Sequence, residues 1–212
     1  MIGPMDLSPR LERIARLIKP LLEPAPGPPP QSGGRPAGVL VPFWDDGARV
    51  QVVFTRRSQN LPHHAGQISF PGGAAEPQDP HLLATALRET AEEIGVAPEQ
   101  VVVVGRVGEV STVTGFLVRP FVGLLKQGVR FNPNASEVVR LVFVPLARVL
   151  DEGAYTTAEV DYSGARLTRP AVVHEGEVIW GATYRILLKL REVLSPVARE
   201  LAAIAEDEGG SC

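Results

Sequence analysis

The chain contains the stretch Arg88-Glu89-Thr90-Ala91-Glu92-Glu93-Ile94-Gly95, in which three glutamates crowd the end of a predicted helix. Carboxylates are disfavoured at a helix C-terminus, because the helix dipole is negative there. Glu89 and Glu93 lie four residues apart, so they also repel each other across one helical turn. Each effect costs on the order of a few tenths of a kcal/mol. A divalent cation would turn this unfavourable arrangement into a binding site, since hard oxygen ligands hold Mg²⁺ or Mn²⁺ well.

The helix that carries these glutamates follows a sharp backbone turn at Phe70-Pro71-Gly72-Gly73. We predict that it begins with Asp79 as N-cap and Pro80 in the first position, and that it ends at Gly95. We expect the apolar stripe of this helix to pack on the domain, with the glutamates projecting beside the stripe. The stripe comprises Leu83, Ala86, Leu87, Thr90 and Ile94. A glycine turn beside an acidic helix indicates a metal site for phosphate chemistry.

Composition and charge exclude several classes of protein. The chain has 212 residues, 44% of them hydrophobic, which is enough for a substantial core. The net charge of -3 gives no basic field for nucleic acid. The only cysteine is Cys212, so a disulfide or a thiolate zinc site within one chain is excluded. The first ten residues lack an apolar signal-peptide core, and no apolar run approaches the length of about 18 residues that a membrane span needs. We therefore expect a cytoplasmic protein with no nucleic-acid or membrane partner.

The chain divides into three predicted parts. Residues 1–36 form an N-terminal helix, capped by Ser8 with Pro9 in its first position, and a linker rich in proline and glycine. Residues 37–195 form the main domain, and residues 196–212 form a helical or flexible C-terminal tail. We expect the first helix, which ends near Pro20, to dock on the main domain; a contact in a homodimer is the alternative.

Within the main domain, strands and helices alternate, with several hairpins between strands. This pattern predicts a mixed sheet covered by helices on both sides. The predicted strands are 38–43, 50–55, 67–70, 101–110, 115–125 with an interruption at Pro120, 138–144, 155–162 and 171–179 with a turn at Glu175-Gly176. Further helices are predicted at 145–150 and 184–193.

Together with Gly73, the glutamate stretch resembles the Nudix box, the signature of the Nudix hydrolase superfamily. That signature is Gly, five residues, Glu, seven residues, then Arg-Glu-apolar-any-Glu-Glu-any-Gly-apolar. Residues 88–96 match its second half almost fully, with Thr90 in the apolar slot. Asp79 takes the place of the earlier glutamate, and one extra residue separates it from Arg88.

A second pattern lies upstream of the box. Thr55-Arg56-Arg57-Ser58, Gly66 and Phe70-Pro71-Gly72-Gly73 resemble, in register, the signature of coenzyme A pyrophosphatases. That signature has an arginine between Ser58 and Gly66, where this chain has Pro62. The two motifs together cover residues 55–96, and the resemblance implies an α/β/α sandwich around a mixed β-sheet. It also implies hydrolysis of coenzyme A or acyl-CoA to 4'-phosphopantetheine and adenosine 3',5'-bisphosphate.

The residues of both motifs receive predicted roles. Hydrolysis of a pyrophosphate needs charge neutralisation and an activated water, and metal ions supply both. We expect Mg²⁺ or Mn²⁺ to be held by Glu89 and Glu93, with Glu92 as a third ligand or as the base that orients water. A backbone carbonyl of Gly72 or Gly73 would complete the shell. Arg88 orients a glutamate or forms only a salt bridge. Substrate phosphate would be held by Arg57, Arg56 and Ser58, and Arg57 is favoured over Arg56 because it sits at the matching motif position.

Several alternatives remain open from the sequence. One alternative is a Nudix hydrolase whose substrate is another nucleoside diphosphate derivative, such as ADP-ribose or a dinucleotide. A second alternative is a catalytically silent nucleotide-binding protein. The glutamates would otherwise form a solvated acidic face, although such faces usually interleave lysines and this helix has none. Glu109 is an alternative base. Three aromatic side chains either stack on adenine or pack in the core, namely Phe116, Trp180 and Tyr184.

Overall fold

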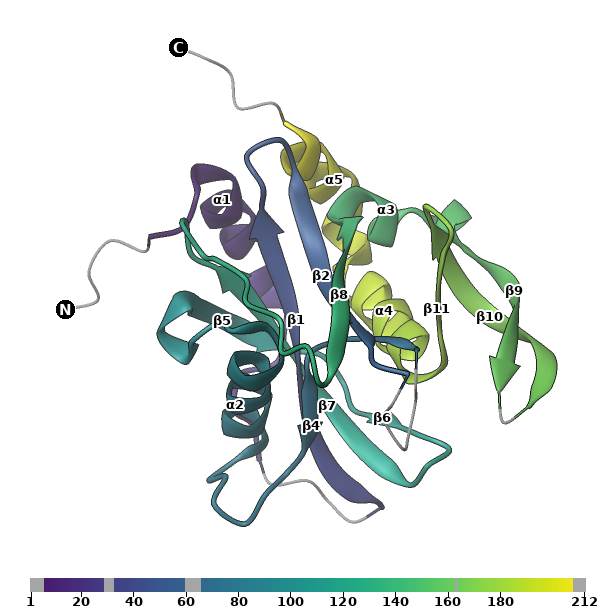
Figure 1. Cartoon of the computed structure of the whole chain (residues 1–212). Coiled ribbons are helices and arrows are strands. Elements are labelled where there is room, and N and C mark those ends of the chain that lie inside the picture. The colour runs from purple at the N-terminus through teal and green to yellow at the C-terminus, as the bar shows by residue number, and fades with distance from the viewer. Residues whose placement is uncertain (1–5, 29–32, 60–65, 163, 208–212) are drawn as a thin grey trace.

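The computed structural model describes residues 6–28, 33–59, 66–162 and 164–207 (Figure 1). Its centre is an eight-stranded sheet with the order β3-β2-β1-β7-β5, in which β4 pairs with β1, β6 with β7 and β8 with β2. These strands are β1 (Arg35–Asp45), β2 (Val50–Arg57), β3 (Ile68–Ser69), β4 (Gly72–Ala74), β5 (Val101–Arg106), β6 (Val110–Ser111), β7 (Phe116–Leu125) and β8 (Val138–Pro145). A separate three-stranded sheet contains β9 (Tyr155–Tyr162), β10 (Ala165–His174) and β11 (Glu177–Trp180).

Five helices accompany the sheets in the described parts of the chain: α1 (Pro9–Ile18), α2 (Leu82–Ile94), α3 (Leu146–Leu150), α4 (Gly181–Leu194) and α5 (Ala198–Glu206). None of them is long and apolar enough to cross a bilayer. Short 3-10 turns follow α1 and α4.

The central sheet is mixed because its two middle strands, β1 and β7, run parallel, whereas all its other pairs are antiparallel. Parallel neighbours need a long crossover connection, and the segment between β1 and β7 includes α2. This crossover places α2 against the middle of the sheet, beside β1 and β4.

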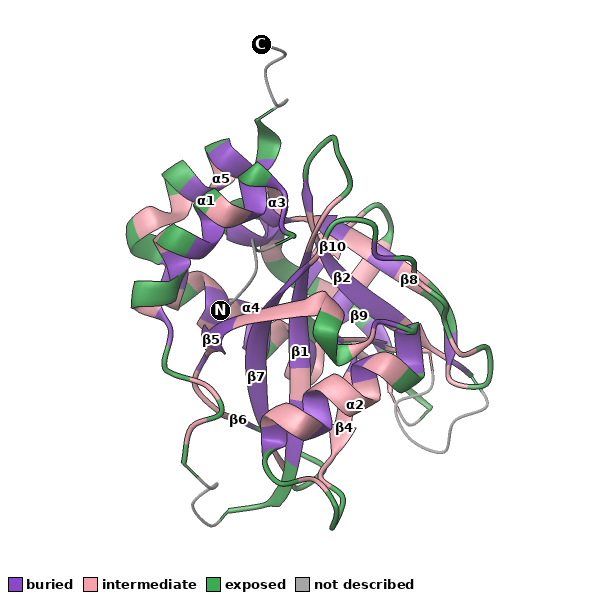
Figure 2. Ribbon diagram, turned by 90° about the vertical axis from the view of Figure 1, so that its left-hand side faces the viewer, coloured by how far each residue is buried: buried purple, intermediate pink, exposed green. Residues whose placement is uncertain are grey.

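Alternate residues of β1 supply the two faces of the sheet. Leu40 packs with Leu82 and Ala86 of α2, whereas Val41 and Phe43 belong to the larger core on the opposite face. That larger core also contains the buried residues of α1, α4 and α5, which gather on one side of the sheet (Figures 1 and 2). The predicted arrangement of helices on both faces of a mixed sheet is confirmed.

The first helix forms as its sequence predicts. The Ser8 hydroxyl accepts a hydrogen bond from the amide of Leu11 at 3.2 Å, and Pro9 occupies the first position. The helix ends at Ile18, one residue before the Lys19-Pro20 step. Its apolar side is fully covered, and the C-terminal helix α5 contributes Leu201 to the same core. Residues 198–206, in the segment predicted as a tail, are thus packed against the body.

The start of the glutamate helix differs from its prediction. The helix begins at Leu82 with His81 as N-cap, whose Nδ1 accepts from the amide of Ala84 at 3.0 Å, and not at Asp79 and Pro80. Asp79 does not cap the helix because its carboxylate accepts hydrogen bonds from Arg88. In the predicted stripe, Leu83 and Leu87 are only half-buried, whereas Ala86, Thr90 and Ile94 are buried. The end is as predicted: Gly95 adopts φ of 72°, which favours glycine.

Two strand predictions are also wrong. The strand expected over 101–110 is divided into β5 and β6, because the chain advances four residues from Arg106 to Val110 while its partner β7 advances only three, from Phe121 to Val118. Pro120 does not interrupt β7, which is continuous from Phe116 to Leu125. Between β5 and β6, the carbonyl of Pro120 in β7 still accepts a hydrogen bond from the amide of Val107 at 3.1 Å. The strand expected over 171–179 forms two strands, β10 and β11, around the predicted turn, and β10 begins earlier, at Ala165.

We expect Ile14→Ala to lower the free energy of unfolding of the whole chain by about 2–5 kcal/mol, since it removes a fully buried side chain that joins α1 to the main core. Arg16→Ala on the exposed face of the same helix should change it by no more than about 0.5 kcal/mol. Chemical denaturation followed by circular dichroism measures both. Equal effects of the two substitutions would contradict the packing of α1 as part of one core.

Candidate functional site

The glutamates of α2 face the glycine turn that forms β4. A Cβ at Gly73 would lie 2.5 Å from the carboxyl carbon of Glu89, so a side chain at this position would displace that carboxylate. The amide of Gly72 donates to the Glu93 Oε2 at 3.4 Å. The backbone of the turn lies directly against the acidic side of the helix, and this close approach requires glycine.

Glu93 is the most deeply buried of the three glutamates, with 2% of its side chain exposed. From the described residues, its carboxylate accepts hydrogen bonds from the amide of Gly72 and from the Arg57 guanidinium, the latter at 3.3 Å. Burial raises the pKa of Glu93 to about 8; Arg57 opposes this shift and the neighbouring Glu89 adds to it. Both hydrogen bonds are long, so this carboxylate lies in a low-dielectric position with little compensation.

Arg88 holds the other two glutamates. Its guanidinium donates to Glu89 Oε1 at 3.0 Å and to Glu92 Oε2 at 3.1 Å. The Glu89 side chain is 17% exposed, and burial raises its pKa while Arg88 opposes the rise. The Glu92 side chain is 54% exposed. Of the three predicted ligands, Glu89 and Glu93 thus lie inside the site and Glu92 lies at its rim.

Asp79 fixes Arg88 from the opposite direction. Its carboxylate accepts from the Arg88 Nε at 3.2 Å and from a terminal nitrogen at 3.0 Å, and from the Thr85 hydroxyl at 2.9 Å. The hydrogen bonds from Arg88 hold the pKa of Asp79 at about 2, well below its ordinary value. Despite the extra residue in the first half of the Nudix box, Asp79 and Arg88 thus form a salt bridge.

A fourth carboxylate, Glu137, belongs to the site and was missed in the sequence. It lies in the loop before β8, and its negative charge raises the pKa values of both Glu89 and Glu93. Its backbone carbonyl accepts from the amide of Ser58 at 2.7 Å. No motif spacing connects Glu137 with α2, because contacts between segments distant in sequence bring this loop beside the helix: β8 pairs with β2, and the amides of Asn132 and Asn134 donate to the carbonyls of Ile94 and Glu93.

The donor chemistry of this acidic cluster fits a hard divalent cation. Oxygen ligands are those that Mg²⁺ and Mn²⁺ prefer, and a cation would relieve the poorly compensated charge of Glu93. Within the described ranges, however, no three acidic, histidine or cysteine side chains converge as a ready ligand group. Arg88 donates to one oxygen each of Glu89 and Glu92.

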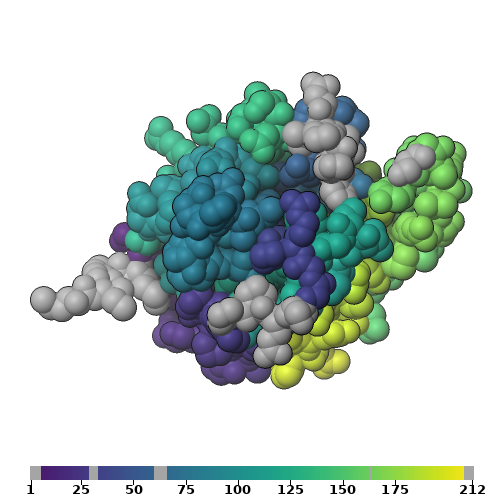
Figure 3. Space-filling view, turned by 90° about the horizontal axis from the view of Figure 1, so that it is seen from below, coloured from purple at the N-terminus to yellow at the C-terminus, as the bar shows by residue number. Residues whose placement is uncertain are grey.

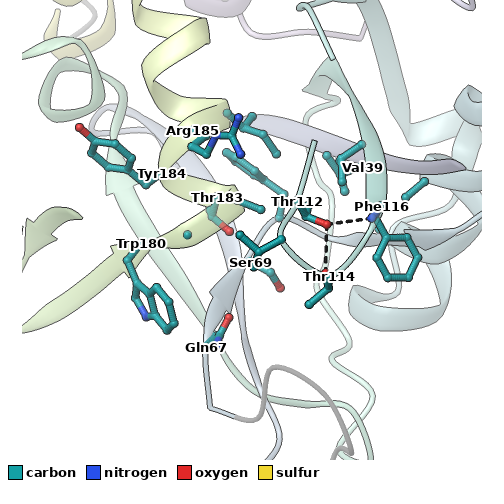
Figure 4. A pocket seen from close by; sticks show the side chains of 18 of the residues that line it. Val39, Gln67, Ser69, Thr112, Thr114, Phe116, Trp180, Thr183, Tyr184 and Arg185 are labelled. Atoms are coloured by element: carbon teal, nitrogen blue, oxygen red, sulfur yellow. Dashed lines mark hydrogen bonds between the residues drawn. The ribbon is translucent and has the colours of Figure 1, made fainter. Parts of the chain in front are cut away.

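A cavity of about 1080 Å³ opens beside the glycine turn. It lies between the central sheet, the start of α4 and the three-stranded sheet, and Gly72, Gly73 and Arg57 line it at the acidic end. Buried apolar side chains form much of its wall, and Figure 4 shows Trp180 and Tyr184 on one side and Phe116 on the other. In Figure 3 the β9–β10 hairpin, coloured green, stands out from the body as a separate lobe. The three aromatic residues considered for adenine stacking therefore share one cavity.

The predicted phosphate-binding residues separate in the structure. Arg57 lines the large cavity and bonds Glu93, whereas Arg56, its neighbour on β2, donates to Glu177 of the three-stranded sheet at 2.6 Å. Arg56 lines a different cavity, of about 400 Å³. Ser58 is buried, and its amide bonds the loop of Glu137. The register of β2 against β8 shifts between Arg56 and Arg57, and the two side chains bond different carboxylates.

Two further sequence features lie elsewhere. Glu109, the alternative base, accepts hydrogen bonds from the buried Arg119, which also donates to the carbonyl of Pro28. Glu109 does not line the large cavity. Pro62 lies outside the described residues.

Comparison with known proteins identifies the family. The sequence model of the NUDIX domain matches residues 34–162. The uncharacterized Nudix hydrolase NudL of Photorhabdus laumondii is 36% identical over 168 residues, which cover 78% of this chain and 89% of that protein. The NudL protein of Pectobacterium atrosepticum is 37% identical over 156 residues, which cover 74% of this chain and 81% of that protein. This chain belongs to the Nudix family and is a Nudix hydrolase.

Solved structures support the fold assignment. A MutT/nudix family protein of Enterococcus faecalis superimposes with a TM-score of 0.54 at 15% identity, covering 84% of this chain and 75% of that one. RenU, a Nudix hydrolase of M. smegmatis, gives a TM-score of 0.52 at 19% identity, covering 83% and 94%. Identities this low establish the fold alone. Nudix hydrolases bind small nucleotide substrates and generally use divalent metal ions.

We expect Asp79→Asn to lower the free energy of unfolding at pH 7 by about 1–3 kcal/mol, because the charged hydrogen bonds to Arg88 are lost. The folded-state pKa of Asp79 is depressed, so its contribution is present above the ordinary value of 3.8 and is lost as the pH falls toward about 2. The difference between wild type and variant should therefore shrink below pH 4, as measured by urea denaturation at several pH values.

Glu76→Gln is the matched control. Glu76 lies 4.0 Å from the same guanidinium but is 48% exposed, so its loss should cost less than about 1 kcal/mol. A stability difference for Asp79→Asn that did not change with pH would contradict the assigned ion pair.

Proposed function

We propose that this Nudix hydrolase cleaves the pyrophosphate bond of coenzyme A or acyl-CoA. The products are 4'-phosphopantetheine, or its acyl form, and adenosine 3',5'-bisphosphate. One observation carries the proposal: Arg57, from the motif typical of coenzyme A pyrophosphatases, bonds Glu93 and also lines the large cavity. The second motif is thus joined to the Nudix box at the place where a diphosphate would meet the glutamates.

The shape and chemistry of the cavity support a long amphipathic substrate. Its volume of about 1080 Å³ is at the upper end of the range of about 300–1,000 Å³ for ligand pockets. Its buried wall is apolar, and aromatic and arginine side chains surround it. Coenzyme A combines these needs, because an aromatic base and charged phosphates are joined to an uncharged pantetheine arm.

Each residue of the site has a role in the proposed reaction. Glu89, Glu93, Glu92 and the carbonyl of Gly73 would hold Mg²⁺ or Mn²⁺, which neutralises charge on the diphosphate oxygens when bound. Arg57 holds the buried Glu93 and presents its guanidinium to the cavity, where it attracts a substrate phosphate.

Arg88 orients the outer carboxylates from the position that Asp79 fixes. Where Glu92 acts as the base and not as the third metal ligand, its half-exposed carboxylate at the rim of the site would accept the proton of a water molecule as that water attacks phosphorus. The oxygen bridging the two phosphorus atoms then leaves with one of the two products.

Hydrolysis of another nucleoside diphosphate derivative, such as ADP-ribose or a dinucleotide, is the second candidate. Pro62 favours it, because it replaces an arginine that the coenzyme A motif usually contains. A cavity lined by aromatic residues would also accept such nucleotides.

The substrate assignment predicts that the purified protein with Mg²⁺ or Mn²⁺ converts coenzyme A to adenosine 3',5'-bisphosphate, detected by liquid chromatography. ADP-ribose and dinucleoside polyphosphates, assayed in parallel, should be cleaved more slowly. Faster cleavage of either would favour the second candidate. Nucleotide binding without metal-dependent turnover of any of them would favour a silent binding protein.

Glu93→Gln should lower kcat/KM by more than about 100-fold, because even the loss of an outer partner of a metal ligand costs about 10–100-fold. The fold should be retained, since glutamine has the same shape and still accepts from Arg57 and Gly72. The control is Glu99→Gln, at an exposed position after the helix, which should keep normal turnover and metal dependence. Near-normal activity of Glu93→Gln at saturating metal would remove Glu93 from the site.

A further inference from the structure

Arginine is the only charged residue type among the described residues that line the large cavity. Four arginines contribute, each from a different element: Arg35 from β1, Arg57 from β2, Arg169 from β10 and Arg185 from α4. The whole chain has 24 acidic and 21 basic residues, so an acid-free lining does not follow from composition. A concave surface with one sign of charge concentrates ligands of the opposite sign.

Only one of these four guanidiniums is neutralised by the protein. Arg57 is paired with Glu93, whereas the other three have no carboxylate within ion-pair distance in the described parts of the chain. Throughout those parts, five arginines lack such a partner, and three of the five line this one cavity; the five are Arg35, Arg130, Arg169, Arg185 and Arg199. All three are exposed, so their guanidiniums are accessible to a ligand at the rim of the cavity.

Two of the three arginines contact the same hairpin, formed by β6 and β7. Arg35 lies over the ring of Phe116, 4.7 Å from its centre, and Arg185 donates to the carbonyl of Ser111 at 2.5 Å. Ser111 is the pairing partner of Leu117, the residue next to Phe116, so the two arginines are anchored at neighbouring positions. These contacts orient both guanidiniums but leave their charge uncompensated.

The tip of this hairpin adds hydroxyl groups. The Thr112 and Thr114 hydroxyls lie 3.0 Å apart and line the cavity beside Phe116, as Figure 4 shows. Arg169 lines the same cavity from the three-stranded sheet. Guanidiniums and hydroxyls are the donors that hold phosphate oxygens.

This group is separate from the acidic end of the cavity. Val39 of β1 pairs with Gly72, whose amide bonds Glu93, and Arg35 lies four residues earlier on the same strand. Four strand residues span roughly 13 Å. A ligand whose diphosphate lies at Glu93 therefore needs a second anionic group to reach the arginines at the hairpin.

We infer that Arg35, Arg169 and Arg185 form a second anion subsite, which selects substrates that carry a phosphomonoester apart from the diphosphate to be cleaved. The inference rests on the proposed function, in which that group is the 3'-phosphate of the adenosine half. Arg57 then serves the diphosphate and the three unpaired arginines serve the 3'-phosphate.

The test compares coenzyme A with dephospho-coenzyme A, which lacks the 3'-phosphate. Wild type should have a kcat/KM about 10-fold or more higher for coenzyme A, as expected for one charged hydrogen-bonding group. The variant Arg35→Gln/Arg169→Gln should bring this ratio close to one. Matched controls are Arg130→Gln and Arg199→Gln, which remove unpaired arginines outside the cavity and should leave the ratio unchanged.

A binding measurement without catalysis separates this inference from the proposed function. Calorimetry should show tighter binding of adenosine 3',5'-bisphosphate than of adenosine 5'-monophosphate, and the double variant should lose that difference. This result would support the subsite even if coenzyme A were not cleaved. Equal affinity for both nucleotides in wild type, or the same loss of discrimination in the control variants, would overturn it.

Discussion

The buried carboxylate of Glu93 is the constraint on which the rest of the site depends. It joins three elements, because α2 carries it, the guanidinium of Arg57 reaches it from β2 and the amide of Gly72 reaches it from β4. A carboxylate so poorly compensated and so deeply buried costs free energy in the isolated chain. Such an arrangement is typical of functional sites, where stability is lost in exchange for a position that binds charge.

The parallel pairing of β1 with β7 gives this constraint its geometry. The crossover between the two strands places α2 on the sheet, so its glutamates lie beside the glycine turn. The same two strands carry the opposite end of the cavity, because Arg35 begins β1 and Phe116 begins β7, and these two residues are direct partners. The pair β1 and β7 thus sets the distance between the acidic end of the cavity and the arginines that contact the β6–β7 hairpin.

Helix ends that depend on neighbouring residues could be predicted from the sequence. Features that depend on tertiary contacts could not. The cap at Ser8 and the stop at Gly95 depend on neighbouring residues alone, and both were found. Asp79 looked like an N-cap, but Arg88, a turn and a half into the helix, holds its carboxylate more strongly than backbone amides would. Glu137 had no detectable signal, because the pairing of two strands distant in sequence brings it to α2.

The adjacent arginines of β2 show how far a motif can be resolved without a structure. The motif position favoured Arg57 over Arg56 as a ligand for phosphate, and in the structure Arg57 bonds Glu93 whereas Arg56 bonds Glu177 of the three-stranded sheet. Arg56 shares Glu177, whose side chain is only 13% exposed, with Arg140 of β8. These salt bridges connect the three-stranded sheet, one wall of the cavity, to the central sheet. Of these neighbouring residues on β2, Arg57 bonds Glu93 at the acidic end of the cavity and Arg56 bonds the three-stranded sheet that forms its wall. The position of the buried carboxylate is therefore coupled to the shape of the cavity.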